Sequence, residues 1–251
     1  MKIDVNFDFT LDSPNYWTDF WERKDGRGGG GSDPDASSPM LQKYHQMLWS
    51  RPLPCGEVMS LEVDVKLYQD GGKQNRLKWK EFVFTSDSIV SSHRYIRLAD
   101  VLDQFKKTVS DYRAYMEGWL HKADTIGGFI IWPCHWNSIN QEKGCNPKIC
   151  DRMDRTLECI RRFYKGEESP MTKCFERDKK FFDLFVDFKG FVDFFFLQDL
   201  VNEEYSSVTM LLGDDKFTTP ALAQTAEEYR QWLEAQLDFV TKRNERISRI
   251  S

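Results

Sequence analysis

The sequence lacks any long apolar run. No stretch approaches the roughly 20 consecutive apolar residues that a membrane-spanning helix needs. The first segment, Met1–Thr10, also lacks the basic start and the apolar stretch of a signal peptide. We therefore expect a protein that is located in the cytoplasm and has no membrane partner.

The sequence also lacks a strong charge of one sign and the usual cysteine pattern of a metal site. The net charge is only −5, which excludes a general basic field for nucleic acid but leaves local patches open. Six cysteines are present without a CxxC pair, and Cys145 and Cys150 are spaced loosely for a structural zinc site. We expect reduced thiols and no metal.

Nucleotide-binding fingerprints are absent as well. The glycine-rich run Gly26–Gly31 matches neither the P-loop nor the dinucleotide motif. It is either a flexible surface loop or a backbone that passes close to a phosphate-bearing ligand. The sequence leaves both interpretations open.

Aromatic residues, in contrast, are abundant, with 19 Phe, 9 Tyr and 8 Trp in 251 residues. Together with 40% hydrophobic residues, they are sufficient for one substantial core. Many of the phenylalanines fall between Phe175 and Phe196, where we expect part of that core.

Hydrophobic periodicity predicts a mixture of strands and helices. Strands are expected at 5–9, 59–67, 77–84, 126–132, 191–197 and 208–212. Helices are expected at 16–21, 38–49, 98–120, 151–164 and 172–185, and a last amphipathic helix follows a capping box at Thr225 and Glu228. Because this order shows no regular βαβ repeat, we predict a single α+β domain over residues 1–251, with a central mixed or antiparallel sheet.

A first candidate site combines Tyr44, His45, Trp49 and Arg51. The guanidinium of Arg51 could bind phosphate or carboxylate, while the rings supply stacking faces for a planar ligand. The alternative is that the rings are core and Arg51 is a surface charge.

A second candidate site is the cluster Ser86, Asp87 and Ser88 at the end of a predicted strand. Hydroxyl and carboxyl groups there could bind a ribose or supply an acid–base group. The alternative is a strand end whose polar side chains satisfy the local backbone.

Three further features carry charge. Asp193 interrupts an apolar run and Asp199 closes it, and burial there would raise a carboxyl pKa unless the side chain faces outward. Arg161 and Arg162 form the best local basic patch for nucleic acid or an acidic partner, unless they pair with acids on their own helix. Asp151, Asp154 and Glu158 could instead hold Mg²⁺ in a nuclease, although arginines interleave with them.

Blocks along nearly the whole chain resemble a bacterial family of unknown function. These blocks are Asp4–Phe9, Tyr44–Gln46, Leu48–Ser50, Ser86–Ile89, Thr125–Gly128, Ser138–Gln141, Leu157–Arg162 and Val192–Asp199. The resemblance implies no activity by itself.

A weaker resemblance is to the ADP-ribosyltransferase toxins of bacterial phage-defence modules. It implies that NAD is a substrate, with Arg51 in the first motif, Ser86–Ser88 in the second and Asp193 or Asp199 in place of the usual late Glu. The target would be RNA, DNA or protein. The alternative is a non-enzymatic interaction module whose partner is a cognate antitoxin or another protein.

Overall fold

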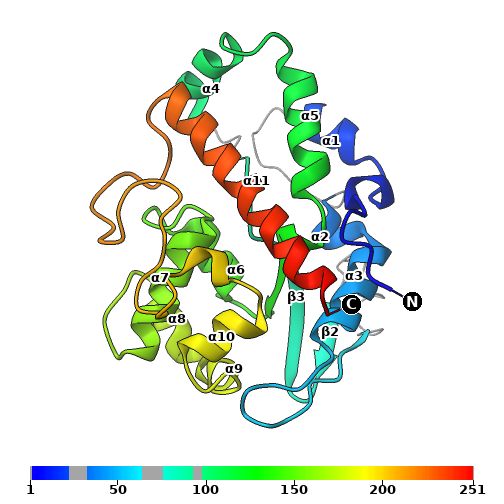
Figure 1. Ribbon diagram of the computed structural model, residues 1–251, viewed down its shortest axis with the longest axis vertical. Helices are drawn as coiled ribbons and strands as arrows, with labels where there is room; N and C mark the ends of the chain where they lie inside the picture. The colour runs from blue at the N-terminus through cyan, green and yellow to red at the C-terminus, as the bar shows by residue number, and fades with distance from the viewer. Residues whose placement is uncertain (1, 23–32, 64–75, 93–97, 251) are drawn as a thin grey trace.

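The computed structural model describes residues 2–22, 33–63, 76–92 and 98–250. Within these ranges, helices surround an antiparallel sheet, and the α+β prediction is confirmed (Figure 1). The Gly26–Gly31 run and the second half of the strand predicted at 59–67 lie outside the described residues.

The sheet has four strands in the order β1 (Glu62–Val63), β2 (Arg76–Trp79), β3 (Phe82–Ser88) and β4 (Phe129–Pro133). The strand predicted at 77–84 is in fact a hairpin, because Lys80 adopts a left-handed φ of 51° and turns the chain between β2 and β3. The strand predicted at 126–132 begins as the 3₁₀ helix η3 (Ile126–Gly128) and continues as β4, which is buried along its whole length.

The N-terminal part of the chain is helical. The helices are η1 (Phe9–Asp12), α1 (Tyr16–Glu22), α2 (Pro34–Ser37) and α3 (Pro39–Trp49). The α3 prediction is confirmed, since Ser38 Oγ accepts from Leu41 N at 3.0 Å and Pro39 opens the helix. The strand predicted at 5–9 is wrong, because Asp8 caps η1 there by accepting from Thr10 N.

The long helix predicted at 98–120 is two helices, α4 (Ala99–Lys106) and α5 (Tyr112–Ala123). Asp111 ends the continuous pattern, because its carboxylate accepts from Ala114 N at 3.0 Å and starts a new helix.

The C-terminal helix α11 (Ala226–Ser248) has the predicted cap at Thr225 and packs against α4, α5 and η3. Figure 1 shows α11 running diagonally across the molecule.

A second group of helices gathers beside the sheet (Figure 1). They are α6 (Ile139–Cys145), α7 (Met153–Tyr164), α8 (Thr172–Arg177), α9 (Lys179–Asp183), α10 (Phe188–Phe194) and η4 (Gln198–Leu200). The prediction of α7 is confirmed, whereas the helix predicted at 172–185 breaks at Asp178 into α8 and α9.

The strand predicted at 191–197 is wrong, because this segment forms the end of α10. A strand with one buried face hides alternate side chains, but Phe191, Val192, Phe194 and Phe195 are all buried. Asp187 caps the helix by accepting from Gly190 N at 2.7 Å. The strand predicted at 208–212 is also wrong, and only a single bridge joins Val208 to Val201.

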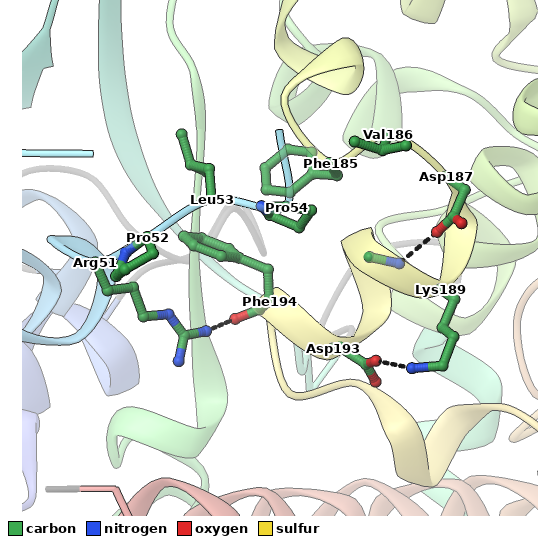
Figure 2. Close-up of a pocket in the computed structure, with 11 residues that line it drawn as sticks. Arg51, Pro52, Leu53, Pro54, Phe185, Val186, Asp187, Lys189, Asp193 and Phe194 are labelled. Atoms are coloured by element: carbon green, nitrogen blue, oxygen red, sulfur yellow. Dashed lines mark hydrogen bonds and ion pairs between the residues drawn. The ribbon is translucent and has the colours of Figure 1, made fainter. Parts of the chain in front are cut away.

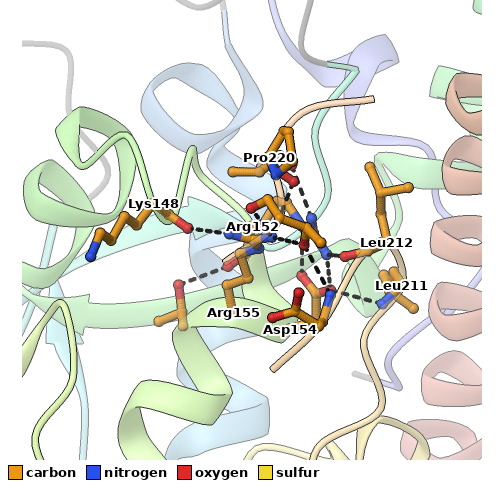
Figure 3. A network of polar contacts seen from close by, with 11 residues as sticks. Lys148, Arg152, Asp154, Arg155, Leu211, Leu212 and Pro220 are labelled. Carbon is orange, nitrogen blue, oxygen red and sulfur yellow. Dashed lines mark hydrogen bonds and ion pairs between the residues drawn. The ribbon is translucent and has the colours of Figure 1, made fainter. Parts of the chain in front are cut away.

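The segment 201–225, which joins η4 to α11, is fastened to α7 by buried arginines (Figure 3). Arg152 donates to the carbonyls of Leu212 and Ala221, at 2.6 and 2.9 Å, and pairs with Asp154. Arg155 donates to the carbonyls of Thr219 and Pro220, both at 3.1 Å. These contacts give a chain segment without regular secondary structure a defined path.

The phenylalanines between Phe175 and Phe196 form part of the core, as the sequence predicts. The ring of Phe181 lies 5.1 Å from that of Phe185, and the ring of Phe191 lies 4.9 Å from that of Phe195.

None of the helices in the described ranges combines the length and the apolar character needed to cross a bilayer.

Candidate functional site

An open groove of about 570 Å³ lies between the segment that follows α3 and the segment around α10 (Figure 2). Its wall combines apolar side chains with four charged ones. The lining residues are Arg51, Pro52, Leu53, Pro54, Phe185, Val186, Asp187, Lys189, Gly190, Asp193 and Phe194. Two predicted catalytic residues, Arg51 and Asp193, therefore line the same groove.

Arg51 follows the C-terminus of α3 and lies among aromatic rings. Its guanidinium carbon is 4.4 Å from the ring centre of Phe194 and 4.3 Å from that of Phe196. One nitrogen donates to the carbonyl of Phe194, while the buried Nε has no partner. No carboxylate in the described ranges lies within 4 Å of this charge, and burial lowers the pKa of Arg51 to about 10. The side chain is thus a cation at neutral pH, and none of the described residues is its counter-ion.

A second arginine, Arg243 of α11, lies behind the same groove and is fully buried. It donates to the carbonyls of Phe195, Gly127 and Phe129 at 2.7 to 3.0 Å, and its Nη2 has no partner. Burial, and then the positive charge of Arg51, lower its pKa to about 9. Both guanidinium groups lie within 6 Å of the Trp49 ring centre. Two cations therefore flank one buried tryptophan.

Asp193 lies on α10, on the other side of Phe194 from Arg51 (Figure 2). It pairs with Lys189 and accepts hydrogen bonds from Tyr205 at 2.7 Å and Gln198 at 3.0 Å. Partial burial opposes ionisation, but these hydrogen bonds outweigh it and lower the pKa of Asp193. Asp193 is consequently an anion on a helix, not a carboxyl within a buried strand.

The turn before α10 forms a strained part of the groove. Val186 has a φ of +68° and a side chain that is 62% exposed. At Gly190, an added Cβ would lie only 2.1 Å from the Phe185 carbonyl and 3.2 Å from Pro54. Glycine at this position therefore lets α10 approach the proline segment closely enough to form the groove.

The other predicted catalytic acid, Asp199, lies on η4 and does not line this groove. Its two carboxylate oxygens accept from Nε and Nη2 of Arg246 at 2.7 and 2.9 Å. This bidentate pair ties η4 to α11. Its predicted catalytic role stays a prediction.

The Ser86 side chain belongs to a buried chain of hydrogen bonds inside the protein. Trp49 Nε1 donates to Nδ1 of His45 at 2.9 Å, so the ring proton lies on Nε2, which donates to Ser86 Oγ at 2.8 Å. Ser86 then donates to Asp35 at 2.9 Å. Burial and then the charge of Arg243 lower the pKa of His45 to about 3. Because His45 already donates to Ser86, it does not act as the base for this hydroxyl.

Asp87 points into a buried ionic cluster. Its carboxylate pairs with Lys143 at 2.6 Å and accepts from Trp132 Nε1 at 2.9 Å, and Lys143 also pairs with Asp151 at 2.8 Å. Burial raises the pKa of Asp87 to about 6, although Lys143 opposes this shift. Burial disfavours the charge of Lys143, but the two carboxylates outweigh it and raise its pKa.

A comparison with protein families places the chain in a known group. The profile of a family of unknown function, DUF6994, matches residues 3–247. The chain belongs to the DUF6994 family. No curated protein and no solved structure matches it. The predicted membership in a family of unknown function is confirmed, whereas no resemblance to ADP-ribosyltransferases is found.

In this DUF6994 protein, the six residues predicted to bind NAD do not line the groove with Arg51. Five of them are buried, namely Tyr44, His45, Trp49, Ser86 and Asp87. Tyr44 accepts from Asp4 N at 3.0 Å, and Ser88 donates to the Val90 carbonyl at 2.6 Å. Of these residues, Trp49 lies nearest to the groove, as the ring beneath Arg51. Their cofactor role stays a prediction.

Arg161 and Arg162 are not an open basic patch. Both pair with Glu158 at 2.7 Å, and Arg162 also donates to the Asp215 carbonyl. The alternative of pairing along α7 therefore holds, and their role toward a partner stays a prediction. The three acids that could have held Mg²⁺ also have partners within the protein. Asp151, Asp154 and Glu158 each pair with a cationic side chain.

Sequence reasoning missed Arg243 and Val186. In the sequence, Arg243 looks like one of the cations that stabilise the C-terminal end of α11. It lies three residues after Val240 and four before Ile247, however, and this spacing places it on the buried face of the helix. Nothing in the sequence signals the exposed, left-handed Val186. The six cysteines, all within the described ranges, are free thiols.

Proposed function

We propose that this protein is a non-enzymatic interaction module that binds a segment of a partner protein in the groove between Pro52–Pro54 and α10. The observation that carries this proposal is Val186. A left-handed backbone costs an L-residue about 1–2 kcal/mol, and a β-branched side chain makes it an outlier. A valine that is 62% exposed recovers little of this cost by burial in the free protein. Strained residues of this kind concentrate at binding sites.

The opposite wall of the groove supports the same proposal. Pro52 and Pro54 restrict the backbone there, so that little conformational entropy is lost when a partner binds. The groove also contains Arg51, Phe185 and Phe194, and arginine and aromatic residues are enriched in protein interfaces. As the partner we propose a cognate antitoxin or another protein.

Peptide display tests this function. A library of random seven-residue peptides is panned on the immobilised full chain, and the affinity of enriched peptides is measured for Val186→Gly. We expect this variant to be at least as stable as the wild type, because glycine relieves the strain, and to bind about tenfold more weakly, because an apolar contact is lost. Leu11→Ala, which trims an exposed apolar residue on η1, is the control.

Two results would contradict the interaction module. One is a library that enriches nothing above the bare support. The other is an enriched peptide whose affinity is unchanged by Val186→Gly but falls with Leu11→Ala.

A second candidate function is NAD-dependent ADP-ribosylation of nucleic acid or protein. It is favoured by the presence of Arg51 and Asp193 in one groove, since a guanidinium can bind pyrophosphate and a carboxylate can stabilise an oxocarbenium-like transition state. Labelled NAD, incubated with the protein and with cell RNA, DNA and protein, tests it. Transfer that disappears in Asp193→Asn supports this function, whereas a folded protein that neither binds NAD nor releases nicotinamide excludes it.

A further inference from the structure

The groove carries more positive than negative charge once its surroundings are included. Lys189 pairs with Asp193, and Asp187 caps α10 through Gly190 N. Arg51 at the edge and Arg243 behind it have no carboxylate partner within 4 Å in the described part of the chain. Three cations therefore stand against two carboxylates, which leaves one positive charge without compensation.

Two buried hydrogen-bond donors also indicate that positive charge is left without compensation. Nε of Arg51 and Nη2 of Arg243 are both inaccessible to solvent and have no hydrogen-bond partner. Buried N–H groups of charged side chains normally have a hydrogen-bond partner, so these two unpaired groups are exceptions. Both groups lie at the Trp49 ring, and they bind the consecutive carbonyls of Phe194 and Phe195.

We infer that the group recognised in this groove is a single carboxylate on an acidic, otherwise apolar peptide segment, and that Arg51 binds it. This inference rests on the proposed function. Nε of Arg51 is inaccessible and Nη2 already donates to the Phe194 carbonyl, so Nη1 is the nitrogen that would donate to the carboxylate. Figure 2 shows the Arg51 side chain beside the apolar wall, where the flanking residues of such a segment would pack.

The charge balance favours a carboxylate over a phosphate. One negative charge neutralises the excess of one positive charge, whereas a phosphate near neutral pH carries close to two. The second charge would face Asp187 and Asp193 in the same groove. Arg243, which is fully buried, strengthens the binding through its field without contacting the ligand.

The peptide display described above also tests this inference. Peptides enriched on the wild type are expected to hold one Asp or Glu among proline and apolar residues. Changing that acid to its amide, or Arg51→Gln in the protein, should each lower the affinity at least tenfold. The two changes together should lower it little further, because both remove the same contact. Arg113→Gln, an exposed arginine on α5, is the matched control and should have no effect.

The outcomes separate this inference from the function on which it rests. Enriched peptides without an acid, but still sensitive to Val186→Gly, overturn carboxylate recognition and leave the interaction module in place. Tenfold tighter binding of a peptide with phosphoserine in place of the acid overturns the choice of a carboxylate. If Arg51→Gln does not fold, as judged by circular dichroism, the amide peptide on the wild type decides the question. A library that enriches nothing overturns both proposals.

Discussion

At the scale of single residues, the pairing of a charge matters more than its presence. Arg51, Arg161 and Arg162 look alike in the sequence, as arginines near aromatic or acidic neighbours. The structure pairs Arg161 and Arg162 with Glu158 and leaves Arg51 with aromatic rings and one carbonyl. An unpaired guanidinium is available to an anionic ligand, whereas a paired one must first break its own contacts.

His45 provides a pH-dependent prediction. Its pKa is about 3 in the folded protein and about 6.5 when unfolded, so only the unfolded state binds a proton between these values. Lowering the pH from 6.5 therefore costs the wild type up to about 1.4 kcal/mol of stability per pH unit, and His45→Gln should escape this loss. Urea unfolding of both proteins from pH 7.5 to pH 4.5 measures the difference.

His135 serves as the contrast for that experiment. Burial disfavours its charge, but its hydrogen bonds to the Trp136 carbonyl and to Asp178 outweigh burial and raise its pKa. Its contribution to stability is present at low pH and is lost as the pH rises through the folded value. His135→Gln should therefore change the pH profile in the opposite direction to His45→Gln. Parallel profiles for His45→Gln and the wild type would contradict the prediction for His45.

At the scale of secondary-structure elements, local signals predicted the starts of α3 and α11, whereas the caps at Asp111 and Asp187 were missed. Ser38 marks the start of α3, and Thr225 with Glu228 marks the start of α11. The run 191–197 is apolar except for Asp193, and so short a run does not distinguish a strand from a buried helix. Its assignment to α10 depends on contacts with other elements.

Arg243 joins three of these elements, and its removal should be costly. Arg243→Met leaves the carbonyls of Phe195, Gly127 and Phe129 without this donor, and we expect a loss of roughly 3 kcal/mol in the free energy of unfolding. Lys242→Met, at the neighbouring exposed position, should change stability by less than about 0.5 kcal/mol. Urea unfolding at pH 7 compares the two, and equal effects would refute a special role for Arg243.

At the scale of the whole molecule, buried arginines help to order a long segment without regular secondary structure. The segment 201–225 connects η4 to α11 and contacts α7 through Arg152 and Arg155 (Figure 3). Its path depends on carbonyls that these side chains bind. The position of α7 is thereby linked to the loop that leads into α11.

Limited proteolysis tests this link. Arg155→Gln removes donors to the carbonyls of Lys148, Thr219 and Pro220, so the segment should open more often. We expect trypsin to cleave after the exposed Lys216 at least tenfold faster than in the wild type, as followed by mass spectrometry. Arg161→Gln, which loses contacts to Glu158 and Glu167 only, is the control. Equal cleavage rates in all three proteins would show that Arg155 does not hold the segment.

The sequence by itself determined the α+β class, the capped helices α3 and α11, the aromatic core and the choice of Arg51 as a candidate. Caps and periodicity are local, so a short window of sequence contains them. The tertiary structure alone decided that residues 191–194 are helical, that Val186 is exposed, and that Arg51 and Arg243 have no counter-ion among the described residues. These properties depend on contacts such as that between Arg51 and Phe194, which are 143 residues apart.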